Sequence, residues 1–182
     1  MPRFSFRPLG NADLDVLYGW MQLPHARAAF GHWTLQEVRV GYGDSIEGRE
    51  PFQAYVVLAD ERPIGMMSWN RFRDYPEMRA CYQVEQPNAV NCDVLLAEMV
   101  HQGLGPGLVR RFLREIAFAD PTVDLCVIDP HSSNAIAIRA YEKAGFRFVR
   151  EVIDFEDGVP LHLMELTRAE LEAPLPVDAP VR

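Results

Sequence analysis

The stretch Gln102-Gly103-Leu104-Gly105-Pro106-Gly107 places three glycines in six residues, where an apolar run ends and an amphipathic helix begins. Glycine lets the backbone turn tightly and lets a ligand approach the backbone N–H groups without a Cβ atom in the way. The following helix directs its unpaired N–H groups and the positive end of its dipole toward this loop. The stretch therefore predicts a phosphate-binding loop, although an ordinary strand-to-helix turn uses the same residue types.

A second motif runs from Asn134 to Phe146 and reads NAIAIRAYEKAGF. It indicates a short helix that contains Tyr141 and stops at Gly145. In this order and spacing, the two motifs resemble those of the GNAT superfamily of acetyl-CoA-dependent N-acetyltransferases. In that family the first motif binds the pyrophosphate of CoA, and the second lies along the pantetheine arm and thioester. The resemblance implies acetyl-CoA as co-substrate and a small-molecule amine as acceptor.

The resemblance also assigns cofactor contacts residue by residue. Gln102, Gly105 and Gly107 match the fixed positions of the first motif. Backbone groups that follow Asp93 are implied to contact the thioester and the pantetheine arm. The residues expected to bind the cofactor are Leu95, Leu96, Ala97, Gln102, Gly103, Leu104, Gly105, Pro106, Gly107, Asn134 and Tyr141.

Acetyl transfer to an amine needs a proton acceptor, because an alkylamine with a pKa of about 10.4 is almost wholly protonated at neutral pH. Asp93 interrupts the apolar run 90–97, and burying a carboxylate without a partner is costly. We expect Asp93 to be the general base or the ammonium anchor; the alternative is an aspartate turned to solvent by strand alternation. Tyr141 matches the family position that protonates the departing thiolate, and its alternative is a core aromatic.

The chain around Asp93 and across 128–146 resembles, more narrowly, the aminoglycoside 6'-N-acetyltransferases. In that subfamily the strand aspartate is the proposed base, and further aspartates bind the cationic sugars. Asp129 and Asp157 match two such positions, although each also fits an ordinary turn. Trp33 is a further candidate for the acceptor side, with loop packing as the alternative.

The segment 71–87 departs from that subfamily, whose acceptor segment is rich in tryptophan and glutamate. Here it holds three arginines, which would repel a polycation: Arg71, Arg73 and Arg79. Two alternatives therefore stay open. Siderophore-biosynthesis N-acyltransferases act on lysine-type amines and usually carry histidine where this chain has Asp93; protein N-acyltransfer is a related possibility. A non-catalytic acyl-CoA sensor would use the same loop without needing Asp93 or Tyr141.

Composition narrows the class of protein further. The chain has 182 residues, 48% of them hydrophobic, which suits one domain with a sizeable core. Its net charge of −8 disfavours nucleic acid as a partner. Without a signal peptide or a long apolar run, we expect a cytoplasmic protein with no membrane partner. The cysteines fall at no metal-ligand spacing, so no metal is expected; a monomer and a homodimer are both compatible with the sequence.

The predicted fold is the α/β GNAT fold, with a mixed central sheet, a splayed strand pair and flanking helices. It is expected over residues 1–170, followed by a disordered tail over 171–182. The segment 25–33 is expected to be a loop and 71–87 to be irregular. Periodicity and turn signals predict strands over 3–7, 53–58, 62–70, 90–100, 123–128, 147–155 and 159–166, and helices over 11–21, from 34 onward, over 108–119 and over 134–144.

Overall fold

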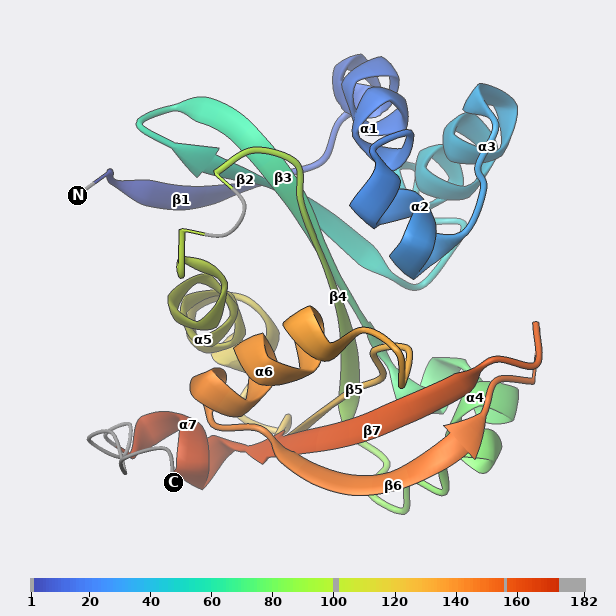
Figure 1. The fold of residues 1–182 in the computed structure, drawn as a ribbon, viewed down its shortest axis with the longest axis vertical. Helices are drawn as coiled ribbons and strands as arrows, with labels where there is room; N and C mark the ends of the chain where they lie inside the picture. The colour runs from blue at the N-terminus through green and yellow to red at the C-terminus, as the bar shows by residue number, and fades with distance from the viewer. Residues whose placement is uncertain (1, 100–101, 156, 174–182) are drawn as a thin grey trace.

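The computed structural model describes residues 2–99, 102–155 and 157–173. Their strands are β1 (Phe4–Pro8), β2 (Gln53–Ala59), β3 (Arg62–Arg71), β4 (Val90–Leu96), β5 (Leu125–Ile128), β6 (Arg147–Ile153) and β7 (Pro160–Thr167). Their α-helices are α1 (Leu14–Met21), α2 (Pro24–Phe30), α3 (Leu35–Ile46), α4 (Pro76–Tyr82), α5 (Gly105–Glu115), α6 (Ala135–Ala144) and α7 (Arg168–Glu172). Figure 1 shows how they surround one sheet.

The sheet has the strand order β1-β2-β3-β4-β5-β7-β6. Neighbouring strands are antiparallel except for β4 and β5, which are parallel. These two strands pair only at Val90↔Cys126 and Asn91↔Val127, whereas β4 continues to Leu96. Beyond Asn91 the two strands separate, and the edge of β4 that faces β5 has no strand partner among the described residues. This gap confirms the predicted splayed pair within a mixed sheet.

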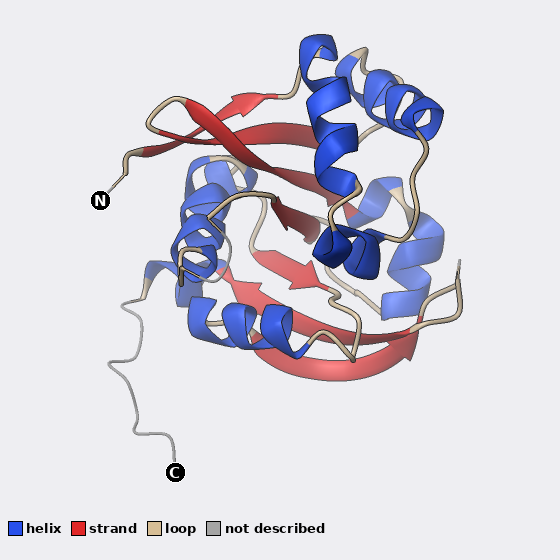
Figure 2. Ribbon diagram, turned by 45° about the horizontal axis from the view of Figure 1, so that its top comes forward, coloured by secondary structure: helices blue, strands red, loops and turns tan. Residues whose placement is uncertain are grey.

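Three apolar clusters hold helices against the sheet. The first joins α5 and α6 to one face, with Phe112 as its largest fully buried side chain. The second places α1, α2 and α3 against Val56, Met66 and Leu95 on the opposite face. The third packs α4 against β5 and β7. In Figure 2 the α1–α3 group and the α5–α6 group lie apart, with the middle of the sheet between them.

Two predictions of irregular structure were wrong. The segment 25–33 contains α2, which begins at Pro24, and the segment 71–87 contains α4, which begins at Pro76. Both helices have seven residues, too few for a hydrophobic period to stand out, and proline in the first turn is their only local start signal. By contrast, the Thr34–Glu37 capping box at the start of α3 was correctly read from the sequence.

Helix α5 begins earlier than predicted, at Gly105 rather than at residue 108. The glycines that suggest a loop are thus partly inside the first helical turn, where Pro106 is compatible with helix because that position needs no N–H donor. The predicted strand over 90–100 ends at Leu96, and the predicted helix over 108–119 gives way after Glu115 to a 3₁₀ turn over Ala117–Ala119.

The C-terminal helix α7 is tied to α5 through a buried guanidinium. Arg110 is 7% exposed and donates hydrogen bonds to the carbonyl oxygens of Ala144 and Ala173, both at 2.9 Å, and to that of Leu171. Leu171 itself is buried. Ordered structure therefore extends past residue 170, beyond the expected start of the tail at 171; residues 174–182 lie outside the described part of the chain.

None of the helices within the described ranges combines the length and the apolar character needed to cross a lipid bilayer.

Candidate active site

A cavity of about 710 Å³ lies where β4 and β5 separate. Its walls come from α2, the exposed edge of β4, the glycine loop with the start of α5, and one side of α6. Val94, Leu95 and Leu96 all line it. Consecutive strand residues point to opposite faces, so a cavity that contacts all three surrounds the free edge of β4. The splay therefore offers a passage from one face of the sheet to the other.

The glycine loop presents backbone N–H groups to this cavity. Gly103 has a φ of 72°, a conformation that favours glycine, and it turns the chain into α5. The N–H groups of Gly105 and Gly107 belong to the first helical turn, which has no intrahelical acceptor for them. A Cβ atom at Gly107 would meet nothing within 4 Å, so no neighbouring atom crowds this glycine. Arg139 and Lys143 of α6 add positive charge to the wall.

These features fit the phosphates and the pantetheine arm of CoA. Free amides at a helix N-terminus and two cationic side chains suit a pyrophosphate. Val94, Leu96 and Leu104 supply an apolar wall for the pantetheine chain. The unpaired edge of β4 can hydrogen-bond amide groups as a neighbouring strand would.

The cavity gathers most of the residues expected to bind the cofactor. Leu95, Leu96, Gly103, Leu104, Gly105, Pro106, Asn134 and Tyr141 all line it. Ala97, Gln102 and Gly107 are not among its lining residues, and the N–H of Ala97 already donates to the carbonyl oxygen of Ile64 at 2.9 Å. Asn134 caps α6, because its Oδ1 accepts a hydrogen bond from the Ala137 N–H at 3.1 Å. Its side chain thus fixes the start of the helix that carries Tyr141.

Tyr141 contacts the cavity from α6 and packs against Phe146, with ring centroids 5.8 Å apart. Its pKa is raised well above the usual value for a phenol, first by burial and then by the negative charges of Asp93 and Asp129. The hydroxyl therefore keeps its proton and is available as a donor.

Asp93 lies on β4, one residue before the cavity wall, and accepts a hydrogen bond from the Ser68 hydroxyl at 3.0 Å. Its pKa is raised to about 7, chiefly by burial and then by the charge of Asp129, while the Ser68 hydrogen bond acts to lower it. A carboxylate that titrates near neutral pH is suited to accept a proton and release it again. The alternative of a solvent-facing aspartate does not fit this partly buried position.

Asp129 follows β5 and is held by two donors. The Tyr82 hydroxyl donates to its Oδ2, and the Asn91 side-chain amide donates to its Oδ1 at 2.9 Å. Burial raises the pKa of Asp129, whereas both hydrogen bonds act to lower it, and the charge of Asp154 raises it again. Sequence reasoning missed Tyr82, Asn91 and Asp154. The position of Asn91, two residues before Asp93 on the same strand face, was the available signal.

Two expected acceptor residues have evident structural roles. Asp157 is exposed, and its Oδ1 accepts a hydrogen bond from the Val159 N–H at 3.0 Å within the β6–β7 turn. The Trp33 indole donates to the carbonyl oxygen of Phe30 at 2.8 Å and packs against Tyr42. Neither lines the cavity at the splay. For both residues the packing or turn alternative accounts for the observed contacts.

Helix α2 forms a wall of the cavity that the sequence did not reveal, since 25–33 reads as a loop. Ala26, Ala29 and Phe30 line the cavity. His25 also lines it, and its Nε2 lies 2.8 Å from the carbonyl oxygen of Leu96, which fixes α2 against the end of β4.

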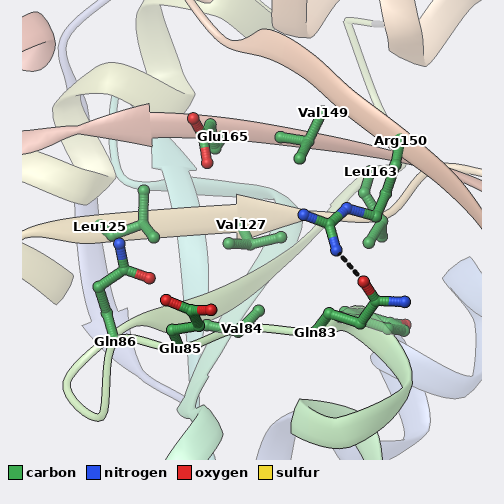
Figure 3. A pocket seen from close by; sticks show the side chains of 11 residues that line it. Gln83, Val84, Glu85, Gln86, Leu125, Val127, Val149, Arg150, Leu163 and Glu165 are labelled. Carbon is green, nitrogen blue, oxygen red and sulfur yellow. Dashed lines mark hydrogen bonds between the residues drawn. The ribbon is translucent and has the colours of Figure 1, made fainter.

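A second cavity, of about 400 Å³, lies between the segment that follows α4 and the strands β5, β6 and β7 (Figure 3). Its floor is apolar, and the Arg150 guanidinium reaches across it to the side-chain oxygen of Gln83. It shares no lining residue with the cavity at the splay. The residues expected to bind cofactor or acceptor do not line it.

Residues 10–155 match the family model described as an acetyltransferase (GNAT) domain. The chain belongs to the GNAT acetyltransferase family. This membership confirms the predicted fold class and the predicted enzyme class, an acetyl-CoA-dependent N-acetyltransferase. The fold of this GNAT enzyme resembles a solved structure of the aminoglycoside acetyltransferase AAC(6')-Ib in complex with coenzyme A and kanamycin, with a TM-score of 0.82 and 32% identity. That match covers 93% of this chain and 98% of the other.

Curated relatives of this GNAT enzyme include two kinds of acyltransferase. It is 29% identical over 175 residues to aminoglycoside N(6')-acetyltransferase type 1 of Klebsiella pneumoniae, covering 91% of this chain and 84% of the relative. It is 25% identical over 153 residues to the lysine N-acyltransferase MbtK of Mycolicibacterium paratuberculosis, covering 82% of this chain and 68% of the relative. Both kinds of acceptor are thus represented among its relatives.

Proposed function

We propose that this enzyme transfers the acetyl group of acetyl-CoA to the 6'-amine of an aminoglycoside. The observation that carries the proposal is the pair of partly buried carboxylates next to the splay, Asp93 on β4 and Asp129 just after β5. A polycationic amine is attracted to such a site, whereas a neutral acceptor gains nothing from it. The names of the aminoglycoside-acetylating relatives support the same acceptor class.

In the proposed reaction each residue has one task. Acetyl-CoA, when bound, supplies the thioester whose acetyl group is transferred. Asp93 takes a proton from the acceptor ammonium, so that the neutral amine can form the new C–N bond. Tyr141 donates its proton to the sulfur as the C–S bond breaks, and the second proton, which the nitrogen loses on becoming an amide, restores the Tyr141 hydroxyl. The amides of Gly105 and Gly107 hold the pyrophosphate, and Asp129 holds a second cationic group of the acceptor.

The arginines of segment 71–87 do not oppose a cationic acceptor as strongly as the sequence suggests. Arg71 forms an ion pair with Asp120 at 2.7 Å, and its guanidinium stacks over the Trp69 ring. Arg79 donates to the backbone oxygens of Val84 and Glu85. Two of the three guanidinium groups therefore make structural contacts and the charge of Arg71 is paired, which weakens the objection to a cationic acceptor.

The test is the release of free thiol from acetyl-CoA with kanamycin, lysine or hydroxylysine as acceptor. We expect turnover with kanamycin that collapses in Asp93→Asn, while CoA binding, measured by calorimetry, is unchanged. Turnover with lysine-type amines alone would assign the enzyme to the siderophore-type acyltransferases. Tight CoA binding without turnover on any amine would contradict the proposal and favour a sensor.

A further inference from the structure

One stripe of helix α6 faces the cavity at the splay. All four residues of this stripe line the cavity and recur at the three- and four-residue spacing of a single helix face: Ile136, Arg139, Ala140 and Lys143. Ala140 lies against the glycine loop, because a Cβ atom added to Gly105 would be 4.0 Å from its Cβ. Helix α6 runs beside α5 (Figure 1). The stripe therefore places two cationic side chains next to the loop expected to bind phosphate.

These two side chains have no counter-charge. Within the described ranges, the side chains of Arg139 and Lys143 form neither an ion pair nor a hydrogen bond, and that of Glu142, their neighbour on α6, pairs with neither of them. Both are exposed, so a ligand can reach them. Like charges four residues apart destabilise a helix slightly. Lys143 lies in the last turn, where the helix dipole favours a cation, but Arg139 lies too far from the end to gain from it. The fold alone does not account for the pair.

Unpaired positive charge is uncommon elsewhere in this acidic chain. The net charge is −8, and Lys143 is the only lysine in the sequence. Other guanidinium groups are commonly paired, as Arg7 is with Asp13 at 2.7 Å. An anion that approaches a protein of this net charge is repelled except where cations gather locally. Two free cations on the wall of one cavity therefore indicate that an anionic group binds there.

CoA has two anionic parts that the fold can bind in different ways. The N–H groups in the first turn of α5 suit its pyrophosphate. Its ribose also carries a phosphate monoester on the 3'-oxygen, which holds about 1.5 to 2 negative charges at neutral pH. A dianion of this kind is bound best by full cations that form charge-assisted hydrogen bonds. Arg139 and Lys143 start beside the loop and have long side chains, so they can reach a group that neighbours the pyrophosphate.

We propose that Arg139 and Lys143 bind the 3'-phosphate of CoA, and that the enzyme thereby selects CoA thioesters over 3'-dephospho-CoA thioesters. The proposal rests on the CoA binding that the proposed function requires, but it does not depend on which amine is acetylated. It gives the two side chains a task that the glycine loop does not perform.

The test is calorimetry of CoA and of 3'-dephospho-CoA with the protein in the absence of an acceptor. At low ionic strength we expect the wild type to bind CoA roughly tenfold more tightly, and we expect added salt to reduce this preference because exposed charges are screened. In the double variant Arg139→Gln/Lys143→Gln, CoA should bind about as weakly as dephospho-CoA, whose affinity should not change. The thermal midpoint should stay close to that of the wild type, because neither side chain holds a partner among the described residues.

The matched control is Arg27→Gln. Arg27 is also exposed and its side chain has no partner among the described residues, but it is not one of the residues that line the cavity. This variant should keep the full preference for CoA. An equal loss of preference in Arg27→Gln and Arg139→Gln would overturn the proposal, because the preference would then reflect net charge and not a contact.

Two other outcomes of the calorimetry would also overturn it. One is a preference for CoA that persists in the double variant. The other is an equal loss of affinity for CoA and dephospho-CoA in that variant, because it would mean that Arg139 and Lys143 bind the pyrophosphate, which both ligands carry.

A second readout uses the single lysine. Reductive methylation with isotope-labelled formaldehyde labels only Lys143 and the N-terminal amine, and a methylated lysine keeps its positive charge. CoA should shift the NMR signal of the Lys143 methyl groups, whereas dephospho-CoA should leave it nearly in place. Equal shifts with both ligands would contradict the proposal.

These measurements separate the proposal from the proposed reaction. Neither needs turnover, so a preference for CoA that depends on Arg139 and Lys143 supports the proposal even if no amine is acetylated. If kanamycin is acetylated but CoA and dephospho-CoA bind equally well, the reaction stands and the proposal fails.

Discussion

Replacing Asp93 by asparagine should make the protein more stable while it abolishes turnover. The pKa of Asp93 is raised from 3.8 to about 7, chiefly by burial and then by the charge of Asp129. A carboxyl group whose pKa is higher in the folded state destabilises that state when ionised. The cost is absent below the unfolded pKa, grows as the pH rises, and is complete above the folded pKa.

The magnitude follows from the shift. A change of about 3.2 pK units at 1.36 kcal/mol per unit corresponds to about 4 kcal/mol above pH 7, and to roughly half of that once water screens the partly buried carboxylate. Asparagine avoids this cost and can still accept the hydrogen bond from the Ser68 hydroxyl. For a domain of this size, about 2–4 kcal/mol raises the thermal midpoint by roughly 5–15 °C.

The assay is thermal unfolding of wild type and Asp93→Asn at pH 5 and at pH 8. The value pH 5 lies only about 1.2 units above the unfolded pKa of 3.8, within a total shift of about 3.2 units, so only part of the cost is present there. The gain in thermal midpoint should therefore be clearly smaller at pH 5 than at pH 8. Asp157→Asn is the matched control, since it makes the same substitution at an exposed turn and should shift the midpoint at neither pH. A variant that is less stable than wild type at pH 8, or equally stabilised at both values, would refute the reasoning.

Three further results are expected. Asp129→Asn should lower the pKa of Asp93 and so move the acidic limb of the kcat/KM profile to lower pH, with KM for kanamycin raised about tenfold; an unmoved limb would mean that Asp129 does not act on Asp93. Tyr141→Phe should lower kcat about a hundredfold or more without weakening CoA binding, as stopped-flow and calorimetric measurements can check; unchanged kcat would leave Tyr141 as a packing residue. Gly65→Ala should destabilise the fold by more than about 2 kcal/mol, because its Cβ would lie 2.3 Å from the Leu95 carbonyl oxygen, whereas Gly41→Ala in α3, with its nearest neighbour at 3.7 Å, should be neutral or stabilising in denaturant unfolding.

The sequence was sufficient for the parts of the fold that carry local signals. The glycine loop, the Thr34 cap and the helix that stops at Gly145 each have a residue whose backbone or side chain marks an element boundary. Helices α2 and α4 were missed because their only start signal is a proline, which is equally common in loops.

The same distinction, between residues with a local signal and residues without one, applies to the candidate site. Asp93 could be chosen from the sequence because a charge inside an apolar strand is conspicuous. Asp129 was also a candidate, but its partners could not be chosen, since Tyr82 and Asn91 reach it only after α4, β4 and β5 are packed together. For Asp157 the sequence already offered a turn role as the alternative, and the structure shows its Oδ1 accepting a hydrogen bond from the Val159 N–H.

The buried guanidinium of Arg110 joins α7 to the rest of the fold. It donates to the backbone oxygens of Leu171 and Ala173 as well as that of Ala144. These hydrogen bonds connect α7 and the end of α6 to α5, the helix that follows the glycine loop. Shortening the chain to residue 170 would remove two of these oxygens and leave the buried positive charge of Arg110 with fewer hydrogen-bond acceptors. A fusion partner or an immobilising tag should therefore be attached at the N-terminus or after residue 173. A loss of CoA affinity in a shorter chain would indicate damage to α5.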